Sequence, residues 1–441
     1  MFSRLTFLGT GAGMPSPNRN VSGLALTFQD GSAWLFDCGE GTQHQLMRAC
    51  GPQGQAVARA LGSEPPAGLT IARLRRVFIS HLHGDHCLGL PGLVLTLAST
   101  RARSEAGAEG GGGGGGGEAA GSAGADEAAA PPSSSPVAPA PCAEDAQYLE
   151  IVGPVGLARM LRAALVGTEA GHLGFQYRVT ELADCGSGAT AAAEGAAEGG
   201  GCSGAGAPPP PPEQLQASEA PPLTLLPDAS GLYRLGTTAA GVSVCGAKLQ
   251  HRVLCFGYAV TEPARAGALD AALAAALGAR GAQLGALKAG RTVALAGGGS
   301  VAPAQCVAPA QPGRTALILG DSLDNSSDAA APCALLRLPC ARGCAVLVHE
   351  ATFCDAQAAH ALPKGHSTAR QAAAFAAELG AERLVLTHLS QRYAPRSAGA
   401  EAAAGIGAIE AEAREELALR GAAGCSVRVV EDFEVVCLLR R

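Results

Sequence analysis

The sequence places three histidines and one aspartate within six residues, His81-Leu82-His83-Gly84-Asp85-His86, directly after an apolar segment that is typical of a buried strand. Side chains two apart in an extended backbone point the same way, so His81 and His83 can face one ion. Gly84 lets the chain turn, which brings Asp85 and His86 toward a second ion. Nitrogen and oxygen donors of this kind suit Zn²⁺. The run holds three of the ten histidines, which favours a zinc site over surface histidines at a turn.

Two ions need further ligands from distant parts of the chain. Three residues are candidates for these ligands: His251, Asp321 and His388. Each of them follows or precedes an apolar run, as a loop residue at the end of a sheet would. Taken singly, a histidine or an aspartate in such a place is more often a structural residue than a metal ligand. Together with the histidine run, they predict that one metal centre is assembled from separate strand ends.

Strand and helix signals alternate along the chain and predict an α/β layered fold. The expected strands include 5–8, 23–28, 33–37, 75–80, 149–152, 242–245, 256–261, 316–319, 345–348, 384–387 and 426–436, and the expected helices include 156–165, 369–379 and 409–419. Two low-complexity stretches, 101–147 and 185–222, are rich in Gly, Pro, Ala and Ser. Such composition cannot offset its own ordering entropy, so we expect disordered inserts there.

Composition limits the class of protein further. The net charge of −6 argues against nucleic-acid binding over the whole surface, although it leaves room for a local basic groove. No stretch approaches the roughly 18 uninterrupted apolar residues of a membrane span. The 15 cysteines are odd in number and irregularly spaced, and no secretory signal precedes the first motif. We therefore expect reduced thiols in an intracellular protein that does not enter a membrane.

These residues resemble the metallo-β-lactamase superfamily and, within it, ribonuclease Z. The segments that carry the resemblance are 7–13 (FLGTGAG), 35–43 (LFDCGEGTQ), 81–93, 349–353 (HEATF), 366–368 (HST) and 387–393 (THLSQRY). The histidine run alone names only the superfamily, whereas the HEATF, HST and THLSQRY segments are specific. The resemblance covers nearly all of the chain outside the inserts. It implies a single catalytic domain over 1–441 with the metallo-β-lactamase fold, an αββα sandwich of two mixed sheets flanked by helices.

By position, the family resemblance implies two Zn²⁺ ions per subunit. One ion would be held by His81, His83 and His251, the other by Asp85, His86 and His388, and Asp321 would bridge them. Two cations about 3.5 to 4 Å apart activate a water and clamp a phosphodiester.

The same resemblance implies roles in proton transfer. Asp85 would accept the proton of the attacking water, and His366 would contact the phosphate and help to protonate the departing 3′ oxygen. His366 is equally explained as part of a helix N-terminal turn capped by its neighbours, and both descriptions can hold. His349 and Glu350 resemble a pair that orients ligands, whereas Asp37 is expected to be a structural turn residue.

The implied activity is removal of the 3′ trailer from precursor tRNA, which leaves a tRNA 3′-hydroxyl and a 5′-phosphorylated trailer. Residues 263–313 resemble the arm with which ribonuclease Z grips tRNA. Their glycines suit a projecting mobile loop, and Arg280, Lys288 and Arg291 could contact phosphates; an ordinary surface loop explains them equally well. The family also implies a homodimer.

Two other functions remain open from the sequence. A hydrolase of a small ester, such as a phosphodiesterase or arylsulfatase-like enzyme, would share every ligand and would not need the arm. An inactive scaffold subunit usually loses ligands, and all seven are kept here. The inserts and the absence of a leader favour cytosol or nucleus, or an organelle if an upstream leader precedes this sequence.

Overall fold

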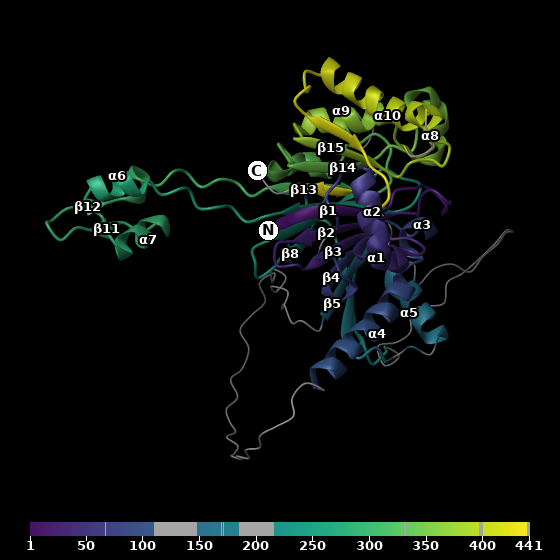
Figure 1. Cartoon of the computed structure of the whole chain (residues 1–441), viewed down its shortest axis with the longest axis horizontal. Coiled ribbons are helices and arrows are strands. Elements are labelled where there is room, and N and C mark those ends of the chain that lie inside the picture. Colours follow the sequence, from purple (N-terminus) through teal and green to yellow (C-terminus); the bar gives the residue numbers. More distant parts are fainter. Residues whose placement is uncertain are drawn as a thin grey trace, which may run out of the picture.

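The computed structural model describes residues 1–66, 68–109, 148–168, 170, 172–184, 216–327, 329, 332–396 and 400–438. Within these residues, two mixed sheets pack face to face and helices cover their outer faces (Figure 1). This is the metallo-β-lactamase fold that the sequence predicted. No helix of the described part has the length and apolar character that crossing a membrane requires.

The first sheet has the strand order β17-β1-β2-β3-β4-β5-β6-β7. Its strands are β1 (Phe2–Gly9), β2 (Gly23–Phe28), β3 (Ala33–Cys38), β4 (Leu74–Phe78), β5 (Tyr148–Pro154), β6 (Gln176–Leu182), β7 (Glu219–Leu225) and β17 (Val435–Cys437). The strands from β17 to β3 pair antiparallel, and those from β3 to β7 pair parallel. Its helices are α1 (Thr42–Cys50), α2 (Pro52–Ala60), α3 (Gly84–Cys87), α4 (Leu90–Glu109) and α5 (Leu157–Gly167).

The second sheet has the order β16-β15-β14-β13-β10-β9-β8. Its strands are β8 (Leu232–Thr237), β9 (Ser243–Leu249), β10 (Cys255–Thr261), β13 (Thr315–Leu319), β14 (Val346–Glu350), β15 (Arg383–Thr387) and β16 (Ser426–Val429). The strands from β16 to β13 pair parallel, and those from β13 to β8 pair antiparallel. Its helices are α8 (Ala358–Lys364), α9 (Ala369–Leu379) and α10 (Ala400–Leu419).

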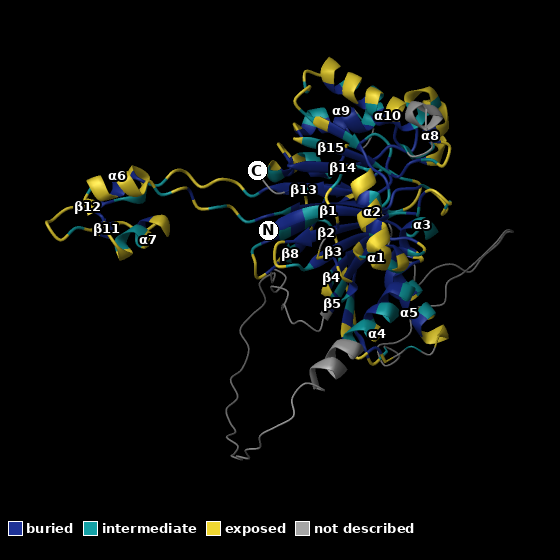
Figure 2. Ribbon diagram, viewed as in Figure 1, coloured by how far each residue is buried: buried dark blue, intermediate teal, exposed yellow. Residues whose placement is uncertain are grey.

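Alternating side chains explain how the layers pack. Leu35 and Val77 belong to the core between the first sheet and its helices, whereas their neighbours Phe36 and Phe78 belong to the core between the two sheets. The rings of Phe36 and Phe78 stack at 4.8 Å, and Tyr258 of the second sheet lies 5.1 Å from Phe78. Burying this aromatic cluster therefore joins the two sheets. Figure 2 shows the strands of both sheets largely in the dark blue of buried residues.

The arm between β10 and β13 is a folded unit. It contains α6 (Ala271–Ala276), α7 (Ala282–Lys288) and the two short strands β11 (Val293–Ala294) and β12 (Ser300–Val301). It projects from the body on two long chain segments (Figure 1). A small core that includes Leu287, Val293 and Val301 holds it together. The segment projects as the sequence predicted, but it contains helices and strands of its own instead of forming a loop.

Some predicted boundaries were also wrong. Helix α4 continues to Glu109, so the first insert does not begin at residue 101, and β7 occupies the end of the second. The predicted disorder of 110–147 and 185–215 lies outside the described residues. The run 426–436 was expected to be one strand, but it forms β16 in the second sheet and β17 in the first.

The hydroxyl of Tyr258 gives a test of the sheet packing. It donates a buried hydrogen bond of 2.8 Å to the carbonyl of Ile79, just before the histidine run. We expect Tyr258→Phe to lower the free energy of unfolding by about 1 kcal/mol, because the carbonyl loses its buried donor. Urea denaturation measures this change, and an unchanged midpoint at the same m-value would contradict it.

Candidate metal centre and active site

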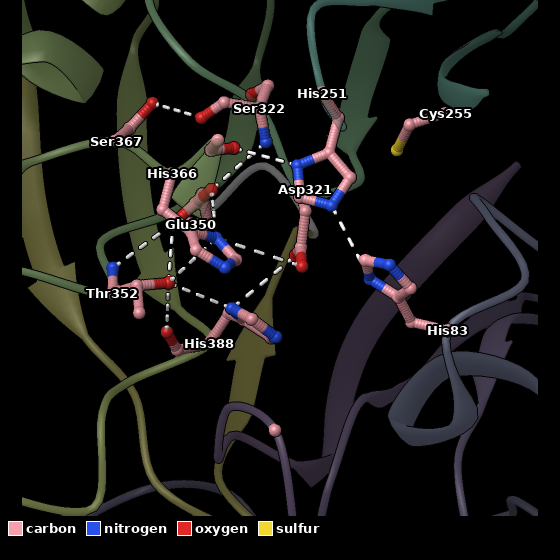
Figure 3. A network of polar contacts seen from close by, with 12 residues as sticks. His83, His251, Cys255, Asp321, Ser322, Glu350, Thr352, His366, Ser367 and His388 are labelled. Carbon is pink, nitrogen blue, oxygen red and sulfur yellow. Dashed lines mark hydrogen bonds and ion pairs between the residues drawn. The ribbon is translucent and has the colours of Figure 1, made fainter. Parts of the chain in front are cut away.

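The ends of strands from both sheets meet at one edge and carry the predicted site residues. His81 follows β4, Asp321 follows β13 and His388 follows β15, while His251 lies in the turn between β9 and β10. Figure 3 shows His251, Asp321 and His388 pointing toward one another, with His83 facing His251. The α/β fold accounts for this convergence, because parallel strands end at the same edge of a sheet.

The first donor group contains His81, His83, His251 and Asp321, whose ligand atoms all lie within 4.8 Å of one another. His81 Nε2 is 2.9 Å from His83 Nδ1 and 3.6 Å from Asp321 Oδ2. His251 Nε2 is 3.5 Å from His83 Nδ1. Three nitrogens and one oxygen of this kind match the donor set of a four-coordinate zinc ion.

The second donor group contains Asp85, His86 and His388, again with all ligand atoms within 4.8 Å of one another. His388 Nε2 is 3.2 Å from His86 Nε2 and 3.4 Å from Asp85 Oδ2. Asp321 Oδ2 lies 3.4 Å from His86 Nε2 as well as 3.6 Å from His81 Nε2. The carboxylate of Asp321 therefore lies between the two groups.

Hydrogen bonds at the far side of the imidazoles hold the rings in place. Nδ1 of His86 contacts Asp37 Oδ2 at 2.7 Å, and Nδ1 of His251 contacts the carbonyl of Gly365 at 2.7 Å. Nδ1 of His388 contacts Thr352 Oγ1 at 2.9 Å. In each case Nε2 is left to face the centre of its group, which is the arrangement found where histidines bind metal.

Asp37 is more closely tied to this site than its expected role as a turn residue implied. Besides contacting His86, its carboxylate accepts hydrogen bonds from the amide and the hydroxyl of Ser80, at 2.7 and 2.9 Å. Its backbone φ of +57° is one that residues other than glycine rarely adopt. The sequence did carry one signal for this role of Asp37. The residue stands at the end of β3, and other strands of this chain also end on ionisable residues.

His366 lies beside both donor groups. Its Nδ1 is 2.9 Å from Glu350 Oε1 and 3.8 Å from Asp321 Oδ2. Burial lowers the pKa of His366, but the charge and the hydrogen bond of Glu350 outweigh burial and leave the pKa raised. Thr368 caps α9 with a capping box, so the structural description of this turn also holds. Glu350 additionally accepts a hydrogen bond from the amide of Ser322 at 3.0 Å (Figure 3).

A glycine-rich loop closes the site beside Asp85. The amide of Gly13 donates to Asp85 Oδ2 at 2.7 Å. Burial raises the pKa of Asp85, but hydrogen bonds with His388 and His86 outweigh burial and hold the pKa well below its ordinary value. Asp85 is therefore a carboxylate. The carboxylate of Asp432 anchors the loop, because it accepts hydrogen bonds from the amide of Thr10 at 2.9 Å and from that of Asn20 at 2.7 Å.

The remaining predicted residues lie elsewhere. Arg280, Lys288 and Arg291 are exposed on the arm. The three histidines without a motif, His44, His172 and His360, are exposed and belong to neither donor group. The structure thus brings together all seven predicted metal ligands and His366, and it separates them from the predicted phosphate contacts.

Known proteins are similar to this chain in sequence and in fold. A sequence model of the family described as "Anti-Pycsar protein Apyc1" matches residues 3–104. "Zinc phosphodiesterase ELAC protein 1" of Mus musculus is 33% identical over 436 residues, covering 98% of this chain and 97% of that protein. "Ribonuclease Z" of Brevibacillus brevis is 33% identical over 391 residues, covering 88% of this chain and 86% of its own length.

The solved structure of human tRNase Z, short form (ELAC1), is 26% identical and covers 99% of this chain and 100% of its own, with a TM-score of 0.53. The fold and the clustered donors define a metal-dependent hydrolase of the metallo-β-lactamase type. The chain belongs to the ribonuclease Z family.

The carboxyl of Asp432 makes stability depend on pH. Burial of the Asp432 carboxyl raises its pKa from 3.8 to about 7, and it outweighs the hydrogen bonds from the amides of Asn20 and Thr10, which act in the opposite direction. The folded state then binds the proton more tightly than the unfolded state. The resulting stabilisation is complete below about pH 4 and is lost as pH rises through about 7. We expect the stability of wild type relative to Asp432→Asn to fall by about 1 kcal/mol or more between pH 5 and pH 8. Equal differences in urea denaturation at both pH values would contradict this expectation.

Proposed function

We propose that this chain is a zinc-dependent endoribonuclease that removes the 3′ trailer of precursor tRNA. The observation that carries the proposal is the pair of donor groups with the carboxylate of Asp321 between them, in a chain of the ribonuclease Z family. Because all seven predicted ligands lie together, an inactive scaffold subunit is disfavoured. The products would be a tRNA with a 3′-hydroxyl and a trailer with a 5′-phosphate.

The donor groups fit two zinc ions. His81, His83 and His251 would hold one ion, Asp85, His86 and His388 the other, and Asp321 would bridge them. Relatives named zinc phosphodiesterase and the nitrogen-rich donor set support zinc. When bound, the ions would lower the pKa of a water molecule and neutralise charge on the phosphodiester.

The protein side chains would handle the protons. Asp85 is the proton acceptor for the attacking water, since it lies among the donors of the second group and the amide of Gly13 orients its carboxylate. The water oxygen forms the new bond to phosphorus, and the bond from phosphorus to the 3′ oxygen breaks. His366 donates a proton to that departing oxygen. Glu350 supports this role, since it raises the pKa of His366 and holds the ring.

The arm offers the contact that a large substrate would use. It extends well beyond the body and is largely exposed (Figure 2). Arg280, Lys288 and Arg291 are exposed on it. Cations in such a place can bind the phosphates of tRNA outside the cleavage site. We also propose a homodimer acting in the cytosol or nucleus, or in an organelle if a leader precedes this sequence.

Cleavage of a precursor tRNA bearing a 3′ trailer tests the chemistry. We expect wild type to cut next to the discriminator nucleotide, and His83→Ala and Asp85→Ala to lose at least about 100-fold in rate, because each removes a donor at the centre. Bound zinc, measured by elemental analysis, should fall in parallel. The exposed His172→Ala is the control and should match wild type. Full activity in a metal-free protein would refute the proposal.

Removal of the arm distinguishes a ribonuclease from a hydrolase of a small ester, because both enzymes would use the same metal ligands. The segments pair at Arg265 and Gln311, so residues 266–310 can be replaced by an Asn-Gly turn. We expect the shortened protein to lose precursor tRNA cleavage by about 100-fold or more, because the phosphate contacts are gone. Hydrolysis of bis(p-nitrophenyl) phosphate should remain within about threefold, since the donor groups are intact. Unchanged tRNA cleavage would favour the small-ester hydrolase.

A further inference from the structure

The two segments that carry the arm are paired with each other. The amide of Glu262 donates to the carbonyl of Arg314 at 2.9 Å, and Arg265 and Gln311 exchange two amide hydrogen bonds of 2.8 and 2.9 Å. Farther out, the amide of Ala308 donates to the carbonyl of Ala268 at 2.9 Å. The stalk is thus an antiparallel ribbon and not two independent strands.

Two glycines allow the ribbon to close tightly. A Cβ atom on Gly313 would lie 1.7 Å from the carbonyl oxygen of Glu262, and a Cβ on Gly267 would lie 1.6 Å from the carbonyl oxygen of Ala308. Real side chains do not approach a backbone oxygen so closely, so only glycine fits at either position. The glycines of the stalk therefore bring its two strands together rather than loosening them.

A buried ion pair closes the root of the stalk. Arg314 donates to Glu262 through Nε at 2.8 Å and through Nη2 at 2.7 Å, and the side chains are 6% and 0% exposed. Glu262 also accepts a hydrogen bond from the amide of Phe2 at Oε1, at 2.8 Å, and its Oε2 lies 3.6 Å from Nη2 of Arg265 in the stalk. Arg314 also donates to the carbonyls of Phe2 and Leu438, and its guanidinium lies 4.5 Å above the ring of Phe2.

This ion pair joins four parts of the chain. They are the segment entering the arm, the segment leaving it, strand β1 and the residue after β17; both labelled ends of the chain lie beside the root of the stalk (Figure 1). Strand β10 begins four residues after His251, and β13 ends two residues before Asp321. The two strands that lead to the donor groups therefore continue into the arm.

Physical chemistry favours a geometric role over a stabilising one. Removing two charges from water offsets most of their attraction, so a buried ion pair adds little net stability. What the planar, bidentate guanidinium supplies is a fixed direction. Here the guanidinium fixes the direction of the chain at the root of the stalk. A small rotation at the root would displace the distant tip of the arm more than a rotation anywhere farther out.

We propose that the Glu262–Arg314 pair is a positioning device that fixes the direction of the arm relative to the donor groups, and so determines the preference for a large RNA over a small diester. This inference rests on the proposed function for its substrate. The glycine-closed ribbon transmits the direction from the root to the folded tip of the arm.

The test compares Arg314→Lys with Arg162→Lys. Arg162 of α5 is the matched control, because it makes a buried bidentate pair with Glu219 of β7, at 2.7 and 2.6 Å, away from the arm. We expect Arg314→Lys to raise KM for precursor tRNA about tenfold, with kcat and the hydrolysis of bis(p-nitrophenyl) phosphate within about twofold of wild type. Arg162→Lys should leave the ratio of the two activities unchanged.

Two further measurements keep the outcome decisive. Gly267→Val lies outside the body and should produce the same KM change even if Arg314→Lys folds poorly. Amide hydrogen exchange in residues 263–269 and 307–313 should speed up in both arm variants and not in Arg162→Lys. Equal losses on both substrates, or unchanged exchange, would overturn the proposal. A wild type that does not cut tRNA would refute the proposed function, while exchange would still decide whether the pair fixes the arm.

Discussion

The carboxylate of Asp321 is the point at which the two halves of the molecule meet. It follows β13 of the second sheet, and its Oδ2 lies 3.6 Å from His81 and 3.4 Å from His86, both of which follow β4 of the first sheet. Burial raises the pKa of Asp321, but the charges of His388 and His86 outweigh burial and leave the pKa well below its ordinary value. A buried negative charge needs such partners, so the sheets must pack in the register that places these donors together.

Much of this site could be predicted because its residues end apolar strands. Residues such as His81 and His388 stand out after buried runs, and the fold then brings the strand ends to one edge. Asp37 was read as structural, because no pattern in one sequence shows that its carboxylate reaches His86. Thr352 was noted only as part of the HEATF segment and was given no role, although its hydroxyl contacts His388.

The parts of the fold that were missed are those where local pattern is weak. Strand β7 contains Pro221 and Pro222, which a sheet tolerates only because β7 lies at its edge. Helix α6 of the arm consists of alanines and one leucine, so its sequence shows little contrast between faces. Strands β16 and β17 read as one strand, but the chain turns between them at Phe433, where φ is +68°. In each case the neighbours in space, and not the local sequence, decide the structure.

The pairing of β1 with β17 also has a consequence for how this chain is made. More than four hundred residues separate the two strands, so the backbone groups along that side of β1 have no sheet partner until β17 has been synthesised. An unpaired strand edge invites association with other chains, and contacts between distant segments form slowly. The nascent protein therefore passes through a long period in which a chaperone would be of most use at its N-terminal strand.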